Sequence, residues 1–426
     1  MVNNKSNMSK TKKKKNSKKK KMTVEQAVAL KYVHEWVYVD SPASQLDDFL
    51  IPNTQKSPEN MLFEMHSHTI CSDGFFSPSA LVKRAHMNGV KVLALTDHDT
   101  MAGIPEALDA AHKYGIRIIP GVEISTIFSP RGESGNKEPV HILAYYGSCG
   151  PARIEELDNC LANIRDGRYL RAKNMLSKLK ILKMPIKWEH VTQIAGNGVA
   201  PGRLHVARAM VEAGHVENLK QAFNRYLYDG GPAYATGSEP LAEEAVDLIC
   251  RTGGVAALAH PWALKNPVAV IRSLKAAGLH AMEVYRSDGK VAGFNDLADT
   301  YELAKLGGSD YHGRGGNDES DLGSVNLPIL SIREFLRVGR PIWCKATKDI
   351  LQSFAEEPSH SNIEKIMKFL RTRKINGNMS LDCGKDIADI CQSLWLTSEE
   401  KQAIELDSLI VKLSEVVTTQ EIPRYL

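Results

Sequence analysis

Histidine and carboxylate side chains recur through the middle of the chain in a pattern that suits metal binding. The set contains six of the fourteen histidines and three carboxylates: His66, His68, Asp73, His98, Glu123, His141, His260, Asp310 and His312. Imidazole and carboxylate ligands without cysteine suit Zn, Mn or Fe rather than a thiolate-rich structural zinc site. Nine side chains exceed the needs of one ion. We therefore expect two or three divalent metal ions that share a carboxylate.

A cluster of divalent ions favours chemistry at phosphate esters. Such ions stabilise charge on attacking and leaving oxygens, and water bound to them becomes nucleophilic near neutral pH. A lone histidine at a strand end is more often structural, and an isolated His-x-His recurs by chance. The hypothesis therefore depends on the whole set, whose members all lie in apolar segments or in the loops just after them.

Those apolar segments are short and separated by amphipathic stretches. They are rich in Val, Ile and Leu and lie at 61–65, 91–95, 117–124, 140–146, 255–259, 281–285 and 304–307. Continuous apolar runs alternating with helical segments, such as 79–88 and 104–114, predict buried parallel strands in βα units. Seven strands favour a barrel over an open sheet, although the sequence leaves closure open. In a barrel, ligands at the carboxyl ends of separate strands converge on one face.

The alternation of strands and helices stops near Gly150 and resumes near Gly253. We expect a basic tail at 1–22 and a helix over 23–37 followed by a linker to residue 60. The remaining segments are a first barrel part, a helical insertion, a second barrel part and a helical extension, at 61–151, 152–236, 237–345 and 346–426. Within the extension, the pattern predicts helices over 364–372 and 398–418.

The composition excludes several classes of protein. Hydrophobic residues make up 43% and charged residues 24%, which is ordinary for a globular chain. The sequence contains no transmembrane-length apolar run and no apolar core of a signal peptide near its N-terminus. Seven widely spaced cysteines suit a reducing compartment. We expect a cytoplasmic or nuclear protein with no membrane partner.

The net charge of +4 conceals an uneven distribution. Residues 1–21 hold ten lysines and no acidic residue, which leaves −6 for the rest of the chain. Two interpretations stay open for this tail. It is either a solvated, disordered arm or a nuclear address or arm that attracts nucleic acid.

The ordered motifs resemble those of the PHP (polymerase and histidinol phosphatase) family. The matching segments are Phe63-Glu64-Met65-His66-Ser67-His68-Thr69, Ser72-Asp73-Gly74, Thr96-Asp97-His98-Asp99, Gly121-Val122-Glu123, Ala259-His260-Pro261 and Gly308-Ser309-Asp310-Tyr311-His312. The resemblance covers about 61–149 and 237–345. It implies an α/β fold, a distorted (β/α)7 barrel with a helical insertion and a helical C-terminal extension, and a trinuclear metal centre.

The resemblance also implies how the ligands divide. One ion would be held by His66, His68, Glu123 and Asp310, a second by Glu123, His141 and His260, and a third by Asp73, His98 and His312. Asp73, His98 and His312 would also take part in catalysis through proton transfer, whereas Asp97 and Asp99 would orient ligands. Two departures stand out. Glu64-Met65 replaces the usual Asp-Leu, and Asp73 stands where some relatives carry His.

A second resemblance lies in the insertion, at Pro201-Gly202-Arg203-Leu204-His205-Val206-Ala207-Arg208-Ala209. It is similar to a segment of one branch of the family, the nucleoside 3′,5′-bisphosphate phosphatases and related 5′→3′ RNA exonucleases, with Leu204 for the usual Pro. Arg203 and His205 become candidates for binding a substrate phosphate, since a guanidinium fork matches phosphate oxygens. The alternative is that Arg203 caps a helix or forms an ion pair on the surface of the insertion. Arg131 is a weaker candidate for the same role.

The sequence thus predicts a metal-dependent phosphatase or phosphodiesterase acting on a nucleotide or the 5′ end of short RNA. Tyr226, Tyr228 and Tyr234 could stack on a base, although aromatics at this spacing are more often core. Three alternatives remain: a histidinol-phosphatase-like enzyme, a proofreading exonuclease domain and an inactive metal-binding interaction module. The sequence leaves open the protein partners, the identity of the metal and the oligomeric state.

Overall fold

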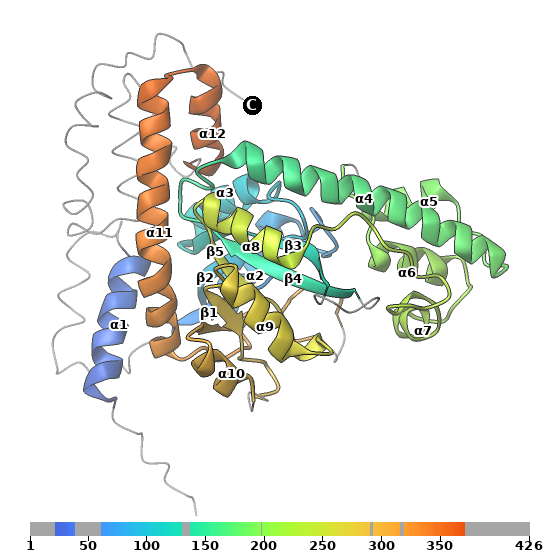
Figure 1. Cartoon of the computed structure of the whole chain (residues 1–426), viewed down its shortest axis with the longest axis horizontal. Helices are drawn as coiled ribbons and strands as arrows, with labels where there is room; N and C mark the ends of the chain where they lie inside the picture. The colour runs from blue at the N-terminus through green and yellow to red at the C-terminus, as the bar shows by residue number, and fades with distance from the viewer. Residues whose placement is uncertain are drawn as a thin grey trace, which may run out of the picture.

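Seven strands form one curled sheet in the computed structural model, which describes residues 22–38, 61–129, 137–196, 198–289, 293–315 and 319–370. The strands lie side by side in chain order (Figure 1): β1 (Leu62–Glu64), β2 (Val90–Leu95), β3 (Arg117–Phe128), β4 (Glu138–Tyr145), β5 (Val255–Leu258), β6 (Ala281–Glu283) and β7 (Ala304–Leu306). A parallel bridge between Ser67 and Tyr311 links the segments that follow β1 and β7. The predicted α/β barrel class is confirmed, in a distorted form.

The direction of β4 corrects the expectation of parallel strands throughout. β4 pairs antiparallel with both β3 and β5, whereas the other neighbouring pairs are parallel. β3 and β4 are consecutive in the chain and pair from Gly121–Tyr145 to Phe128–Glu138, as in a long hairpin, so β4 must run back along β3. The beginning of β4 therefore lies beside the carboxyl ends of its neighbours. His141 reaches the same edge as the other candidate ligands for this reason.

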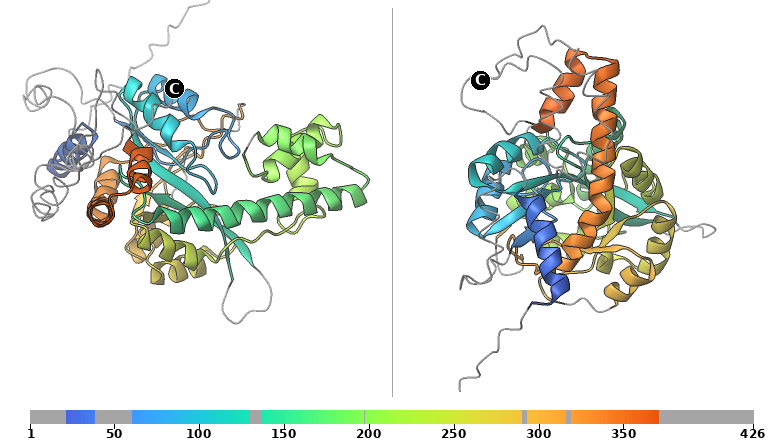
Figure 2. Two further views of the ribbon diagram at one scale, coloured as in Figure 1. Left: turned by 90° about the horizontal axis from the view of Figure 1, so that it is seen from above. Right: turned by 90° about the vertical axis from the view of Figure 1, so that its left-hand side faces the viewer.

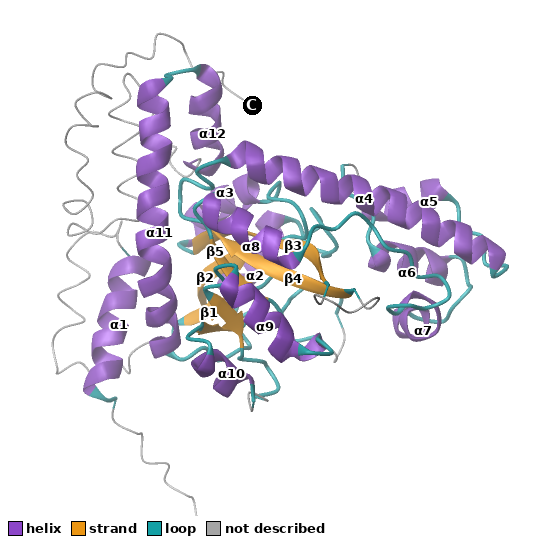
Figure 3. Ribbon diagram, in the orientation of Figure 1, coloured by secondary structure: helices purple, strands orange, loops and turns teal. Residues whose placement is uncertain are grey.

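Helices cover the outer face of the sheet (Figure 3). They are α2 (Pro78–Met87), α3 (Ile104–Tyr114), α8 (Ala242–Arg251), α9 (Pro267–Ala276) and α10 (Phe294–Thr300). Local signals set their ends: Ser77 caps α2 ahead of a proline at its first turn, and Gly115 ends α3 at φ 64°. Their apolar faces pack on strand residues such as Leu93, Ile124 and Ile142. Burial of this face fixes which side chains of each strand point outward.

Two further helices pack on the residues inside the barrel. α1 (Val24–Val37), with a capping box at Thr23, and α11 (Ile329–Glu356) place Trp36 and Trp343 against inward-facing strand residues. The Trp343 indole donates to the carbonyl oxygen of Tyr145 at the end of β4. Because β4 is reversed, this end lies at the amino-terminal side of the parallel strands. α1 and α11 therefore close the barrel opposite the candidate metal ligands.

Between β4 and β5 the chain leaves the barrel and forms a helical insertion, which Figure 2 shows projecting from one side. It contains α4 (Ile154–Ile181), α5 (Trp188–Ala195), α6 (Arg203–Glu212), α7 (Leu219–Ala222) and a π-helical turn, η3 (Phe223–Leu227). The insertion has its own apolar core, built around Met175, Leu179 and Met210. Tyr226 packs against this core, whereas Tyr228 is exposed.

The C-terminal part of the described chain is helical. The boundary expected at residue 346 falls inside α11, which continues to Glu356 before α12 (His360–Leu370) turns back. The helix predicted over 398–418 and the basic tail at 1–21 lie outside the described residues. Among the helices that are described, none combines the length and the apolar character needed to cross a membrane.

Candidate metal centre

Side chains from six strands or the loops that follow them meet at one edge of the barrel. His66, His68 and Asp73 follow β1, His98 follows β2, and Glu123 lies within β3. The remaining candidates come from β4 and from the loops after β5 and β7: His141, His260, Asp310 and His312. The β-bridge between His98 and Glu123 and the hydrogen bond from His68 N to Tyr311 O bring these loops together. The backbone pairing of the barrel thus positions the side chains.

Glu123 occupies the middle of the cluster and is 1% exposed. Its Oε2 lies 3.1 Å from His66 Nε2, 3.2 Å from His68 Nε2 and 3.2 Å from His98 Nδ1. Its Oε1 lies 2.8 Å from His141 Nδ1 and 3.0 Å from His260 Nε2. One carboxylate therefore contacts five imidazoles, as a bridging ligand would.

Eight of the nine candidates form three overlapping groups, and within each group the ligand atoms lie within 4.8 Å of one another. The groups are His66, His68, Glu123 and Asp310; His98, Glu123 and His141; and His68, Asp73, His98 and His312. The first matches the division implied by the resemblance. The second contains His98 in place of His260, and the third gains His68. His260 still contacts Glu123, so all nine side chains are brought together.

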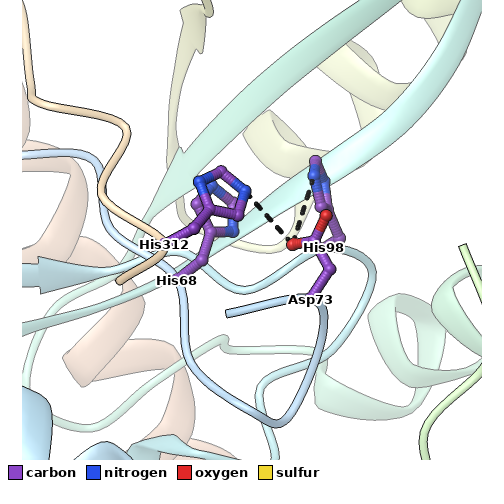
Figure 4. Close-up of side chains that lie close together, drawn as sticks. All are labelled: His68, Asp73, His98 and His312. Carbon is purple, nitrogen blue, oxygen red and sulfur yellow. Dashed lines mark ion pairs between the residues drawn. The ribbon is translucent and has the colours of Figure 1, made fainter. Parts of the chain in front are cut away.

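Figure 4 shows the group nearest the Asp73 loop. Asp73 Oδ1 lies 3.2 Å from His312 Nε2 and 3.9 Å from His98 Nε2. The rings of His68 and His312 stack with their centroids 4.2 Å apart. His66 and His68 are fully buried and form the floor of the cluster, whereas His141 and His260 are about a quarter exposed at its rim.

Opposite charges are concentrated in this small volume. Burial alone would raise the pKa of Glu123, but His98, His66 and His141 hold it well below its usual range. Burial would likewise lower the pKa of His66, which the carboxylates of Glu123, Asp310 and Glu283 raise well above its usual value. The ionised carboxylates therefore favour a cation at this position.

The buried polar atoms test whether metal ions fit this site. His68 Nδ1 and Nε2, Asp73 Oδ1 and His98 Nδ1 are buried and make no well-formed hydrogen bond within the described part of the chain. Buried polar groups are normally hydrogen-bonded, and such orphan atoms require an explanation. Three of these four atoms face carboxylates or imidazoles across the cluster at 3.0–3.9 Å. Imidazole and carboxylate atoms at these positions suit bound divalent ions.

Strained backbone is concentrated at the same edge. Asp99, His260 and Asp310 have positive φ angles of 53°, 28° and 52°. A residue other than glycine in this region is held there at a cost of about 1–3 kcal/mol. Three of the five non-glycine residues with positive φ in the described chain are therefore in or beside the cluster.

Two further carboxylates support the ligand loops. Glu64 accepts hydrogen bonds from Ser309 N at 2.8 Å, Ser309 Oγ at 2.7 Å and Gly323 N at 2.9 Å, and so fastens the loop that carries Asp310. Asp97 accepts from Thr69 N, Thr69 Oγ1 and Ser72 Oγ at 2.6–2.7 Å beside the Asp73 loop. The family resemblance identifies Glu64 only as a replacement of the usual Asp and gives it no partner. Its longer side chain spans the distance to the loop after β7.

Asp99 connects the cluster to the insertion. Its Oδ2 accepts from Arg168 Nε at 2.6 Å, and Arg168 Nη2 also donates to Ser125 Oγ at 2.7 Å. Arg165 Nη1 donates to the Asp99 carbonyl oxygen at 2.7 Å. The sequence does not identify Arg165 and Arg168 as site residues, because arginines on a long helix are ordinarily solvent-exposed. Their spacing of three residues, on one helix face, was the available signal.

The predicted phosphate-binding residues lie outside the metal cluster. Arg203 Nη1 contacts Asp229 Oδ1 at 2.5 Å, and its guanidinium lies 5.8 Å from the centre of the Tyr234 ring. His205 is buried and accepts a hydrogen bond from Gly202 N at 2.9 Å. Burial lowers the pKa of His205 to about 4, partly offset by Asp73. Arg131 lies outside the described residues.

The sequence matches a domain-family model and is similar to those of known proteins. The sequence model of the PHP domain matches residues 64–198. A 5′-3′ exoribonuclease, Rnm, of Salmonella typhimurium is 32% identical over 262 residues, which are 59% of this chain and 85% of the relative. A 3′,5′-nucleoside bisphosphate phosphatase of Chromobacterium violaceum is 31% identical over 298 residues, which are 68% of this chain and 98% of the relative.

Solved structures give the same result. A protein of Bifidobacterium adolescentis, inferred to be a metal-dependent phosphoesterase, has a TM-score of 0.57 at 29% identity, covering 66% of this chain and 98% of its own. An amidohydrolase of Chromobacterium violaceum with bound sulfate has a TM-score of 0.56 at 30% identity. The match covers 67% of this chain and 96% of the amidohydrolase. The resemblance seen in the motifs is confirmed: the chain belongs to the PHP domain family and is a metal-dependent phosphoesterase.

Proposed function

We propose that this enzyme hydrolyses a terminal phosphate ester of nucleotides, with nucleoside 3′,5′-bisphosphates or the 5′ ends of short RNA as substrates. The observation that carries the proposal is the contact of Glu123 with five imidazoles. Glu123 belongs to two of the three ligand groups and contacts His68 and His98 of the third. The named activities of the two curated relatives support the nucleotide class. Sulfate in a structural neighbour supports a site for a tetrahedral anion.

The proposed ligands are the nine predicted residues, and the proposed cofactor is two or three ions of Mn, Zn or Fe. His66, His68, Glu123 and Asp310 would hold one ion. Asp73, His98 and His312, with His68 beside them, would hold another. Glu123 and His141 would hold a third with His98 or His260. When bound, such ions supply charge stabilisation for the phosphoryl group and a nucleophile at neutral pH.

The residues proposed to take part in catalysis are those of the Asp73 group. His312 Nδ1 lies 2.8 Å from the Asp310 carbonyl oxygen, which fixes the ring and turns Nε2 toward Asp73. Asp73 and His98 are each less than 15% exposed, at the edge from which a substrate enters. We propose that Asp73, His98 and His312 take part in catalysis, and that those of the three that hold no ion transfer protons to and from the ester oxygens.

Arg203 and His205 are proposed to select the substrate, together with Arg131. The ion pair between Arg203 and Asp229 is about one third exposed, so a substrate phosphate could replace the Asp229 carboxylate without burying a new charge. Arg168, in contrast, is committed to Asp99 and Ser125 and serves to fix the insertion to the metal loop. The insertion, proposed to span 152–236, would then cover and shape the site.

The test compares four substrates on the same purified enzyme: a nucleoside 3′,5′-bisphosphate, a nucleoside monophosphate, 5′-phosphorylated RNA and histidinol phosphate. We expect preferred turnover of the bisphosphate or RNA with added Mn. Preferred turnover of histidinol phosphate would favour the small-molecule alternative. No turnover of any substrate by metal-loaded protein would favour a binding module.

A further inference from the structure

Glu283 lies behind the metal cluster, at the end of β6, and is 2% exposed. β6 supplies none of the nine proposed ligands. Glu283 nevertheless reaches two of them from behind. Its Oε1 lies 3.1 Å from His66 Nδ1, and its Oε2 accepts from the backbone N–H of His260 at 2.7 Å. The two oxygens of one buried carboxylate are therefore divided between two candidate ligands.

The contact with His66 determines how the ring presents its nitrogens. An ionised carboxylate only accepts hydrogen bonds, so it fixes the ring proton on Nδ1. Nε2 is then the nitrogen that is left to exchange its proton for a metal ion, and it faces Glu123 Oε2 at 3.1 Å and Asp310 Oδ1 at 3.4 Å. A carboxylate behind a ligand histidine is the arrangement that orients the ring and raises its basicity toward a metal.

The contact with His260 acts on the backbone. His260 has φ 28° and ψ 58°, a conformation that a residue other than glycine adopts only when its surroundings impose it. The hydrogen bond from its N–H to Glu283 holds this conformation. The ring is thereby directed into the cluster, with Nε2 3.0 Å from Glu123 Oε1.

We propose that Glu283 is a positioning residue that prepares two metal subsites at once, through the ring of His66 and the backbone of His260. The inference rests on the metal centre of the proposed function, and Glu283 itself contacts no metal. Loss of this carboxylate should weaken metal binding while the barrel stays folded.

The decisive variant is Glu283→Gln, which keeps the shape but has one acceptor oxygen and one NH2 group. If the amide oxygen of the variant side chain accepts from the His260 N–H, its NH2 group faces His66 Nδ1. An NH2 group only donates, so Nδ1 must accept and the ring proton moves to Nε2. Nε2 is the atom that a metal ion requires. Zn affinity is measured by competition with a chromophoric chelator. We expect a 10- to 100-fold loss for at least one ion, the size typical of such supporting residues.

Glu138→Gln is the matched control. Glu138 is also a buried strand glutamate that accepts a backbone N–H, from Lys265, but it contacts none of the nine ligands. The melting temperature of both metal-free variants is measured as well. The inference predicts that Zn raises the melting temperature of Glu283→Gln less than that of Glu138→Gln and of the wild type.

Equal Zn affinity of Glu283→Gln, Glu138→Gln and the wild type would overturn the inference. A lower metal-free melting temperature with an unchanged Zn affinity would show a merely structural role. If Glu283→Gln fails to fold, Glu283→Asp replaces it, because the shorter carboxylate keeps its charge but cannot reach both partners. Absence of Zn binding in the wild type would instead refute the proposed metal centre. The experiment therefore distinguishes failure of the inference on Glu283 from failure of the proposed function.

Discussion

Glu123 and His141 lie on neighbouring antiparallel strands, with Glu123 Oε1 2.8 Å from His141 Nδ1. In a fully parallel barrel, a residue this early in its strand would lie far from the carboxyl edge. The reversal of β4 brings the start of that strand to the edge instead. Glu123 can therefore contact imidazoles from both sides of β3. His66 and His98 come from the side of β1 and β2, and His141 and His260 come from the side of β4 and β5.

This relationship predicts the effect of Glu123→Gln. The amide keeps the size of the side chain but removes the charge that we propose to be shared between ions. We expect the variant to lose more than one ion per chain, with a large loss of phosphoesterase activity. Elemental analysis of wild type and variant checks this. Loss of a single ion, with the rest retained at wild-type affinity, would refute the bridging role.

Arg203→Ala tests the proposed recognition of a second phosphate. A charge-assisted contact contributes about 1.5–3 kcal/mol, which corresponds to a roughly 10- to 150-fold loss of kcat/KM on a 3′,5′-bisphosphate. A simple aryl phosphate should be affected far less, and metal content should not change. Arg203→Lys should recover only part of the loss, because it lacks the planar fork.

Asp229→Ala is the control for Arg203. It frees the guanidinium from its partner, so bisphosphate turnover should be retained or improved. If Arg203 only stabilises the insertion through this ion pair, the two variants will lose activity alike on both substrates. That outcome would show that Arg203 stabilises the surface of the insertion and does not bind the substrate.

His205 predicts a pH dependence of stability. Burial lowers its pKa from 6.5 to about 4 in the folded chain. Between these values the unfolded chain binds the proton and the folded chain does not, so the contribution is complete above pH 6.5 and is lost as the pH falls toward 4. The full contribution is at most about 3 kcal/mol.

Guanidinium unfolding of wild type and His205→Gln at pH 7 and pH 5 isolates this contribution, since every other titrating group is common to both proteins. The free energy of unfolding should fall further in the wild type as the pH is lowered. Identical pH dependence in the two proteins would contradict the assignment of a neutral, buried His205.

The basic tail is predicted to act apart from catalysis. We expect deletion of residues 1–21 to leave turnover of a mononucleotide nearly unchanged, because exposed charges act over only about 8–10 Å at physiological salt. RNA affinity or nuclear localisation should fall. Steady-state kinetics and fluorescence microscopy of the deletion check the two parts, and a large loss of mononucleotide turnover would place the tail at the site.

Much of the fold and site was predictable because the signals are local. Apolar runs identified the seven strands of the sheet, and the nine metal-ligand candidates stood in these runs or in the loops just after them. The direction of β4 was not predictable, since a buried antiparallel strand and a buried parallel strand have the same apolar pattern. Its reversal explains how His141 reaches Glu123, and the bridge between His98 and Glu123 brings His98 into the same group.

Supporting residues were harder to predict than ligands. Glu283 is one glutamate at the end of a three-residue strand, and its two partners lie 217 and 23 residues away in the chain. Arg168 lies three residues from Arg165 on α4, but this spacing alone does not show that Arg168 is buried. Contacts of this kind arise from the packing of distant elements, which residue type and spacing do not encode.

Metal removal tests the central claim most directly. Purified, metal-replete enzyme is analysed for metal content and assayed on a nucleoside 3′,5′-bisphosphate before chelation, after chelation and after re-addition of Mn or Zn. We predict more than one ion per chain, loss of turnover on chelation and its return with metal. At most one ion per metal-replete chain, with turnover unaffected by chelation, would contradict the account.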